Sequence, residues 1–256
     1  MAAAISIDAA FYLDRVLPAL NQGLLVSCKL IVPAAVFGFI GGVLLGTLRV
    51  YGPAAGRKVG DAVTTVVRGV PLLVQLFFIY SCLPKIGMWL DSLCSALTAS
   101  MPEIVRYESD LFLNLLRLDA FASALAGFIL CSAAYHSEYI RGALLSIRQG
   151  QIKAAQALGF STRQLLFSVV VPQALRRALP GCGNEIIYLI KYSSLAYVIS
   201  CIELTGEANV LAGRTYRYIE IYLAVGAYYL ALTTIASVIL SRLEKHFAIP
   251  GFSGKM

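Results

Sequence analysis

The stretch "LLVSCKLIVPAAVFGFIGGVLLGTL", residues 24–48, decides the fold class. It is a continuous apolar run with one charged residue, Lys29, and a helix needs about 20 such residues to cross about 30 Å of hydrocarbon. Gly38, Gly42 and Gly46 recur every four residues and would therefore share one face of that helix. A glycine face allows a second helix to approach closely. The stretch predicts a membrane-spanning helix that packs tightly against a neighbour.

Apolar runs of comparable length recur along the chain, at 61–83, 120–140, 181–202 and 219–241. Hydrophobic residues make up 59% of the sequence and charged residues 14%, whereas about one quarter of an average soluble domain is charged. The runs are continuous and lack the strict alternation of membrane β-strands. We therefore predict an all-α integral membrane protein, a single transmembrane domain over 1–256 with five spans.

The net charge of +7 raises the possibility of nucleic-acid binding, so the positions of the basic residues matter. Six basic residues and no acid lie between Arg141 and Pro180, and further basic residues lie between the first two spans and in the C-terminal tail. Half of the 14 acidic residues lie in 84–119 and 203–219. By the positive-inside rule, the basic loops face the cytoplasm and the acidic connections face outward. This predicts an N-out, C-in topology and excludes a nucleic-acid interpretation of the charge.

Local sequence features refine this topology. Residues 7–20 are predicted to form a short amphipathic helix on the outer surface, with Pro18, Asn21 and Gly23 marking the entry to the first span. Gly69 and Pro71 predict a kink or break within the second span. The outward segment 84–119 is predicted to contain one or two surface-lying helices, and its role is not evident from the sequence.

The loop after the third span, residues 146–178, reads as two cytoplasmic helices. Residues 151–158 are good helix formers, and Gly159 is a natural helix stop. Ser161 with Gln164 three residues later predicts a capping box at the start of the next helix. A short helix of small residues displayed in this way is suited to a groove on another protein, although it can equally be a hairpin that only stabilises the cytoplasmic side.

Four motifs resemble those of the membrane subunits of ATP-binding cassette importers, specifically the polar amino acid permease group. The family's signature is E-A-A, three residues, G, nine residues, I-x-L-P, and this chain has Lys153-Ala154-Ala155, Gly159 and Val169-x-Val171-Pro172 at that spacing. The other three motifs are "RGVPLLVQLFFIY" at 68–80, "EYIRGALLSIRQGQ" at 138–151 and "PQALRRALPGCGNEIIYLIKYSSL" at 172–195. Only 84–119 is not covered by the resemblance.

The resemblance implies a transport subunit that binds no cofactor and is not an enzyme, since ATP would be hydrolysed by a cytoplasmic ATPase dimer. No GxxxxGK[ST] phosphate loop occurs in the sequence. The further implied partners are a periplasmic or lipid-anchored solute-binding protein and a second permease subunit, identical or homologous, in a bacterial inner membrane. The residues implied to couple to the ATPase are Gly150, Gln151, Lys153, Ala154, Ala155, Ala157 and Gly159. Lys153 replaces the family's usual glutamate.

The second candidate site lies in the fourth span. Charges at membrane depth are costly and normally face a bundle interior or a water-filled path, which draws attention to Glu185 and Lys191. Lys191 suits an α-carboxylate, while the alternative is a polar lock between helices. The candidate substrate path comprises Glu185, Lys191, Tyr192, Ser193 and Ser194. Tyr192 stands where the family often has aspartate, which bears on substrate choice.

Two other functions compete with an importer subunit. A secondary transporter of a small polar solute, driven by an ion gradient, usually shows repeated halves, and no repeat is evident here. A membrane enzyme would need a catalytic cluster, but His136 and His246 are the only histidines, and His136 is interpreted as an interfacial residue. The six cysteines lack a CxxC pair and are interpreted as packing residues rather than a metal site.

Overall fold

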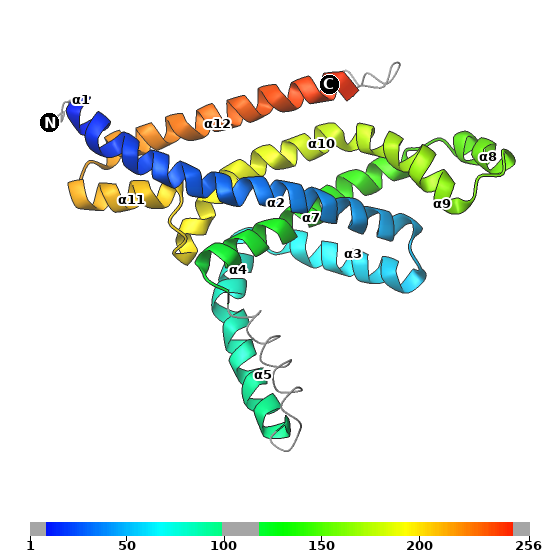
Figure 1. Cartoon of the computed structure of the whole chain (residues 1–256), viewed down its shortest axis with the longest axis horizontal. Helices are drawn as coiled ribbons and strands as arrows, with labels where there is room; N and C mark the ends of the chain where they lie inside the picture. Colours follow the sequence, from blue (N-terminus) through cyan, green and yellow to red (C-terminus); the bar gives the residue numbers. More distant parts are fainter. Residues whose placement is uncertain (1–8, 99–117, 248–256) are drawn as a thin grey trace. The chain divides into compact units, whose positions relative to one another are not determined.

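The computed structural model describes residues 9–98 and 118–247, and among these residues it contains helices and no strand (Figure 1). The predicted all-α class is confirmed. Four helical segments in this part of the chain are long and apolar enough to cross a membrane: Tyr12–Tyr51, Leu72–Leu90, Ala120–Leu145 and Tyr218–Phe247. A fifth results if the consecutive segments Thr162–Ile199 and Leu204–Thr215 form one broken span.

The chain forms two compact units, and each combines stretches that are far apart in sequence. Unit 1 contains the described parts of Met1–Ile31, Val70–Phe128 and Tyr192–Val225. Unit 2 contains those of Val32–Gly69, Ile129–Lys191 and Gly226–Met256. Long helices pass from one unit to the other, so each unit is held together by contacts between helices rather than by sequence continuity.

The N-terminal helix is continuous, and the predicted separate helix over 7–20 is wrong for the described residues. α1 (Ala9–Phe11) leads through the π-helical turn η1 (Tyr12–Val16) into α2 (Leu17–Tyr51). Pro18 has no N–H to donate, and the wider turn of η1 just before it absorbs the lost hydrogen bond. The proline therefore does not interrupt the helix.

The predicted kink at Gly69 and Pro71 is confirmed and is a full break. α3 (Ala54–Gly69) ends there, and α4 (Leu72–Phe77), the π-helical η2 (Phe78–Cys82) and α5 (Leu83–Thr98) follow. The side chain of Gln75 donates to the carbonyl of Val70 at 2.7 Å, which satisfies a backbone acceptor at the break. The range 61–83 is thus divided between two helices. In the range 84–119, α5 extends to Thr98 and residues 99–117 lie outside the described part.

In unit 2 the glycine face of α2 packs against α7 (Ala120–Leu145), as the spacing predicted. A Cβ atom on Gly46 would lie 3.0 Å from the carbonyl oxygen of Ser137, and one on Gly42 would collide with the Cβ of His136. His136 is fully buried and its ring meets that of Phe39 edge to face at 5.6 Å between centroids. Its interpretation as an interfacial residue is therefore wrong, because the glycines make room for it between the helices.

The fourth predicted span, 181–202, changes helix type and then breaks. α10 (Val171–Tyr192) continues into the 3₁₀-helix η4 (Ser193–Ile199), and Ser200 adopts a left-handed conformation with φ 67°. After a short break come α11 (Leu204–Thr215) and α12 (Tyr218–Phe247). The predicted connection 203–219 therefore contains a helix, whose buried Leu204, Ala208 and Ala212 repeat every four residues.

A buried carboxylate holds this break within unit 1. The Glu203 side chain accepts hydrogen bonds from the N–H groups of Thr205 and Gly206, at 2.9 and 3.1 Å, and so caps α11. The Ser27 hydroxyl of α2 donates to the same carboxylate at 3.1 Å and accepts from the N–H of Leu204 at 3.1 Å. The start of α11 is thereby tied to α2.

The close contact at Gly42 yields a test of the packing. Gly42→Ala should lower the free energy of unfolding by about 1–3 kcal/mol, because the added methyl group forces α2 and α7 apart. Gly142→Ala on α7 is the matched control, since a Cβ there meets nothing within 4 Å and alanine favours a helix. Thermal unfolding of the two variants in detergent measures the difference, and equal stability would contradict the packing role.

Candidate functional site

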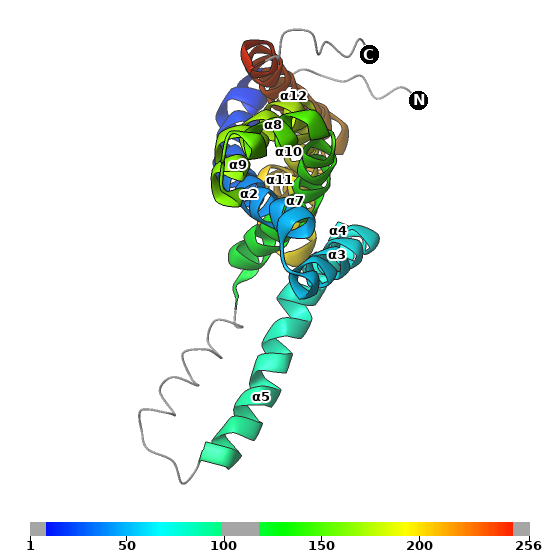
Figure 2. The same cartoon turned by 90° about the vertical axis from the view of Figure 1, so that its right-hand side faces the viewer.

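The predicted cytoplasmic helix is α8 (Gln149–Ala157), which begins two residues earlier and ends one residue earlier than predicted from the sequence. A short turn joins it to α7, and α9 (Thr162–Leu165) and the π-helical η3 (Leu166–Val170) lead from it into α10. α8 and α9 lie beside each other in both views (Figures 1 and 2). α8, α9, η3 and the adjoining ends of α7 and α10 all belong to unit 2.

Gly159 ends α8 by a specific mechanism. Its φ is +81°, in the left-handed region that glycine adopts without strain. The N–H of Gly159 donates to the carbonyl of Gln156 at 2.9 Å, and that of Phe160 donates to the carbonyl of Ala155 at 3.1 Å. This pair of bonds is a Schellman motif and satisfies carbonyls that the helix end would otherwise leave open. The predicted role of Gly159 as a helix stop is confirmed.

The capping box at the start of α9 is also confirmed. The Gln164 N–H donates to the Ser161 hydroxyl at 3.3 Å, and the Gln164 side-chain oxygen accepts from the Ser161 N–H at 2.9 Å. The two caps fix the chain direction on both sides of Phe160. The tight turn between α8 and α9 is thus specified by local sequence.

A buried apolar cluster anchors α8 on its base. Ala155 is buried and Ile152 half-buried, and both pack with side chains from the end of α7, from α9 and from α10, among them Leu144, Leu165 and Ala174. The Arg177 guanidinium of α10 donates to the carbonyl and hydroxyl oxygens of Ser146, at 2.7 and 2.9 Å, in the turn before α8. The helix is therefore held from its inner face and from its N-terminal side.

The opposite face of α8 is exposed, and apolar side chains are exposed around it. Gln151, Lys153, Ala154 and Ala157 are all exposed, as is Gly150. Leu158 is 78% exposed, Phe167 67% and Phe160 39%. Phe167 also lines a surface pocket with Ser161, Arg163, Gln164 and Ser168. Large exposed apolar side chains on and beside a helix of nine residues, too short to span a membrane, indicate an interaction surface.

A network of ion pairs joins three helices of unit 2, and it is centred on Arg49 in the last turn of α2. The guanidinium donates to Asp61 of α3 at 2.7 Å, to Glu138 of α7 at 2.7 Å and to the hydroxyl of Ser137 at 3.1 Å. Only 5% of the Arg49 side chain is exposed. Glu138 also pairs with Arg68 at 3.2 Å and with Arg141 at 3.3 Å. These contacts fix the last turn of α2 to the middle of α3 and to the C-terminal third of α7.

Sequence reasoning missed this network. It counted Arg49 among the basic residues between the first two spans, whose charge records orientation, and it considered Arg68 and Glu138 only as parts of motifs. The sequence contained one signal of this contact, a glycine at position 60, one turn before Thr64 on α3. In the structure Gly60 leaves room for the Arg49 side chain, because a Cβ atom on Gly60 would lie 2.7 Å from the Cγ of Arg49. A single glycine in a polar helix does not identify its neighbour, so the contact itself required the structure.

The candidate substrate-path residues lie where α10 changes into the 3₁₀-helix η4. Glu185 is 3% exposed, whereas Lys191 is exposed and its ammonium group lies 5.5 Å from the centre of the Tyr188 ring. Tyr192 is 36% exposed, Ser194 is half-buried and Ser193 is fully buried. The structure thus does not bring Glu185 and Lys191 onto one face of the helix, and Lys191 and Tyr192 form the accessible part of the set.

Metal ligation finds no support in the described part of the chain, where no group of three or more histidine, cysteine or acidic residues is placed to hold an ion. Cys131, Cys182 and Cys201 are buried singly. The arrangement of unit 2 offers instead a displayed helix on an anchored base, which is a geometry for binding another protein.

Comparison with known proteins bears directly on this geometry. The family of binding-protein-dependent transport system inner membrane components matches residues 16–249. The glutamine transport system permease protein GlnP of Escherichia coli (strain K12) is 34% identical over 230 residues, which are 88% of this chain and 93% of that protein. The probable amino-acid permease protein YxeN of Bacillus subtilis (strain 168) is 30% identical over 91% of this chain and 93% of its own length.

Solved structures of ABC transporters also contain chains whose fold is similar to that of this chain. A crystal structure of an amino acid ABC transporter with histidines has a chain that is 28% identical, with a TM-score of 0.75 over 92% of this chain and 97% of that one. The inward-facing MetNI methionine ABC transporter shares the fold, with a TM-score of 0.68 over 91% of this chain and 98% of that one at 17% identity. The match over 16–249 and the similarity to GlnP place this chain in the family of binding-protein-dependent transport system inner membrane components, the permease subunits of ATP-binding cassette importers.

Proposed function

We propose that this permease subunit moves a polar amino acid, delivered by an external solute-binding protein, across a bacterial cytoplasmic membrane. The names of its relatives support this substrate class, since they include permeases for glutamine and for octopine. The energy comes from ATP hydrolysed by a cytoplasmic ATPase dimer, and this chain binds neither ATP nor another cofactor. A second permease subunit, identical or homologous, completes the path. The alternative of an ion-driven secondary transporter gains no support from these relatives.

The exposed face of α8 is the observation that carries the proposal. An ATPase groove that receives α8 would cover Leu158 and the small residues Ala154 and Ala157, whose short side chains allow close seating. The Schellman motif at Gly159 and the core around Ala155 give the helix a fixed direction. Closure of the ATPase dimer would therefore move α8 together with its base, as a rigid lever rather than a flexible loop. Lys153 would lie at the rim of this contact, where a charge contributes little.

Lys191 is the residue that best fits contact with the solute. Lys191 is an exposed residue whose ammonium group suits the α-carboxylate of an amino acid, while Tyr192 offers an aromatic face and a hydroxyl. The buried Glu185 has the character of a structural residue within unit 2. The absence of an acid at Tyr192 disfavours recognition of a cationic side chain by this subunit alone.

We expect the C-terminus to lie in the cytoplasm and the N-terminus outside, since the basic residues concentrate in the loops around α8 and α3. Fusions of alkaline phosphatase and of green fluorescent protein at Met256 measure this orientation. Alkaline phosphatase is active only on the external side of the membrane, whereas green fluorescent protein fluoresces in the cytoplasm. A fluorescent, phosphatase-inactive C-terminus is the expected result. A phosphatase-active, non-fluorescent C-terminus would contradict this topology, because it would place α8 on the external side of the membrane, where a cytoplasmic ATPase cannot bind it.

Leu158→Asp should abolish copurification of the ATPase and solute uptake without lowering the stability of the permease, because the side chain is 78% exposed and contributes little to the core. Leu158→Met keeps the apolar surface and should retain both activities. Gly159→Leu should give a different outcome, with loss of stability as well, since leucine at a positive φ costs about 1–2 kcal/mol. Normal uptake by Leu158→Asp would refute docking through α8.

Lys191→Met should abolish uptake and substrate-stimulated ATP hydrolysis while the assembled complex is retained, because the change removes the charge that faces the carboxylate. Lys29→Met is the matched control, since Lys29 is also an exposed lysine on a long apolar helix but lies outside the proposed path. Uptake and ATP hydrolysis in proteoliposomes measure both variants. Unchanged uptake kinetics in Lys191→Met would leave selectivity to the solute-binding protein.

A further inference from the structure

The segment 141–180 of unit 2 carries charge of one sign. It contains six basic residues and no acid. Two of the six have partners within unit 2, since Arg141 pairs with Glu138 and Arg177 donates to Ser146. The other four are exposed and form no ion pair with another described residue: Arg148, Lys153, Arg163 and Arg176. The segment thus presents positive charge that it does not neutralise itself.

Two of these side chains, Lys153 and Arg163, face away from the same buried cluster. Ala155 of α8 and Leu165 of α9 both belong to that cluster. Each basic residue lies two positions before the buried one, which is about 200° around a helix, so it lies on the opposite face. α8 and α9 lie beside each other (Figures 1 and 2). We call the outward surface formed by Lys153, Leu158 and Arg163 the basic docking surface.

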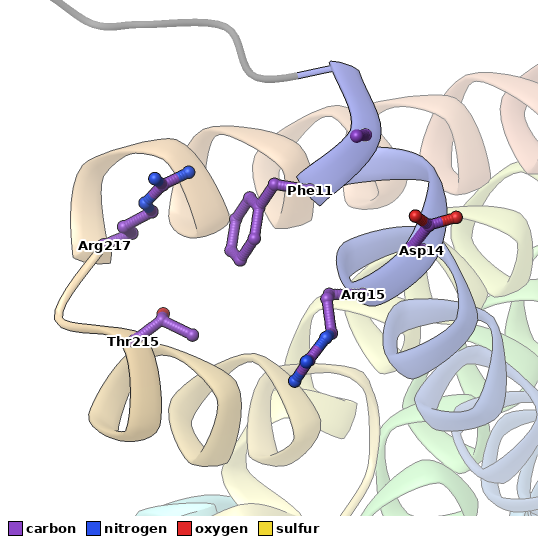
Figure 3. Close-up of a pocket in the computed structure, with 6 residues that line it drawn as sticks. Phe11, Asp14, Arg15, Thr215 and Arg217 are labelled. Carbon is purple, nitrogen blue, oxygen red and sulfur yellow. The ribbon is translucent and has the colours of Figure 1, made fainter.

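A surface pocket of about 450 Å³ adjoins this surface and shares its charge. Its lining holds one charged residue, which is basic, and comprises Ser161, Arg163, Gln164, Phe167 and Ser168. A pocket in unit 1 is different, because its lining combines Asp14 with Arg15 and Arg217, and Figure 3 shows the two guanidinium groups pointing apart. The guanidinium of Arg163 and the two serine hydroxyls can donate hydrogen bonds to a carboxylate. The pocket beside α9 therefore suits an acidic side chain of a partner.

Charges on a docking surface affect the choice of partner more than the strength of binding. An exposed ion pair contributes little to affinity, as stated above for Lys153. Complementary charges across an interface accelerate association, whereas like charges placed opposite each other oppose it. A surface with two basic residues and no acid therefore discriminates between partners by the sign of their charge.

We propose that the basic docking surface selects its ATPase by charge: Lys153 and Arg163 pair with carboxylates on the rim of the ATPase groove, and a basic rim is rejected. This inference rests on the proposed docking of an ATPase on α8. Leu158 lies between the two basic residues, so a groove that covers it brings its rim against them. The short side chains of Ala154 and Ala157 beside Lys153 allow the close seating of a protein, which lipid headgroups do not require.

The test is the rate at which the ATPase associates with the full-length permease, measured by surface plasmon resonance in phosphatidylcholine nanodiscs. The probe is the ATPase that copurifies with the wild-type permease, purified apart from it. The wild-type rate should fall about tenfold between about 50 mM and about 500 mM NaCl, because salt screens the charges. At the lower salt concentration Lys153→Glu and Arg163→Glu should each slow association about fivefold, although the first introduces the glutamate usual in this family.

Arg176→Glu is the matched control. Arg176 is exposed and its reversal changes the net charge by the same amount, but it lies on α10 and does not line the pocket. Its association rate should stay within about twofold of the wild-type rate. Exchange of a rim carboxylate of the ATPase for lysine should restore the rate of Lys153→Glu or Arg163→Glu. Melting temperatures equal to that of the wild type show that the exposed substitutions leave the fold intact.

The outcomes separate this inference from the docking on which it rests. Loss of ATPase binding in Leu158→Asp, with unchanged association rates in Lys153→Glu and Arg163→Glu, would overturn charge selection and leave the docking role of α8 standing. Equal slowing by Arg176→Glu would reduce the effect to net charge. Slowing that occurs only in nanodiscs with phosphatidylglycerol would assign the two side chains to lipid headgroups. Undiminished binding by Leu158→Asp would refute docking on α8 itself.

Discussion

The buried guanidinium of Arg49 is the interaction on which unit 2 depends. It is almost inaccessible to solvent and has carboxylate partners on two other helices, Asp61 on α3 and Glu138 on α7. A guanidinium buried this far depends on its carboxylate partners, because the loss of both would leave its charge buried without compensation. Separation of the last turn of α2 from α3 and α7 is therefore unfavourable. Since α7 leads directly into the turn before α8, this restraint also defines the base on which the displayed helix stands.

One buried cluster of side chains connects the end of α7 to α8. Side chains from the last turns of α7, such as Ile140 and Leu144, belong to the same buried cluster as Ala155 of α8 and Ala174 of α10. Dense packing transmits displacement with little compression. A force applied to the exposed face of α8 would thus act on α7 and α10 together, which is what a permease driven by a separate ATPase requires. Small residues lie on both faces of α8. Ala155 packs in the buried cluster, and the short side chains of Ala154 and Ala157 on the exposed face allow another protein to approach the helix closely.

The break after η4 poses a different physical problem, because backbone polar groups that are buried away from water need internal partners. The structure solves it in unit 1 with side chains. Glu203 caps α11, and Ser27 of α2 bonds both the carboxylate and the N–H of Leu204. Irregular backbone inside membrane proteins commonly lines a solute path. The proximity in sequence of Lys191 and Tyr192 to this change of helix type supports the role proposed for them.

The sequence by itself determined the features that depend on local chemistry. The apolar runs predicted the helical membrane fold, Pro71 the break after α3, Gly159 the end of α8, and Ser161 with Gln164 the cap of α9, because each follows from neighbouring residues along one helix or turn. Helix breaks without a proline escaped prediction, as at α11, where the cap is the carboxylate of Glu203 and its partner Ser27 is 176 residues away. Only the tertiary structure decided that the Arg49 side chain is buried, because its partners Asp61 and Glu138 come from two other helices that the sequence does not bring together. It also decided that Glu185 and Lys191 face different surroundings, because exposure depends on the helices packed around α10 rather than on α10 itself.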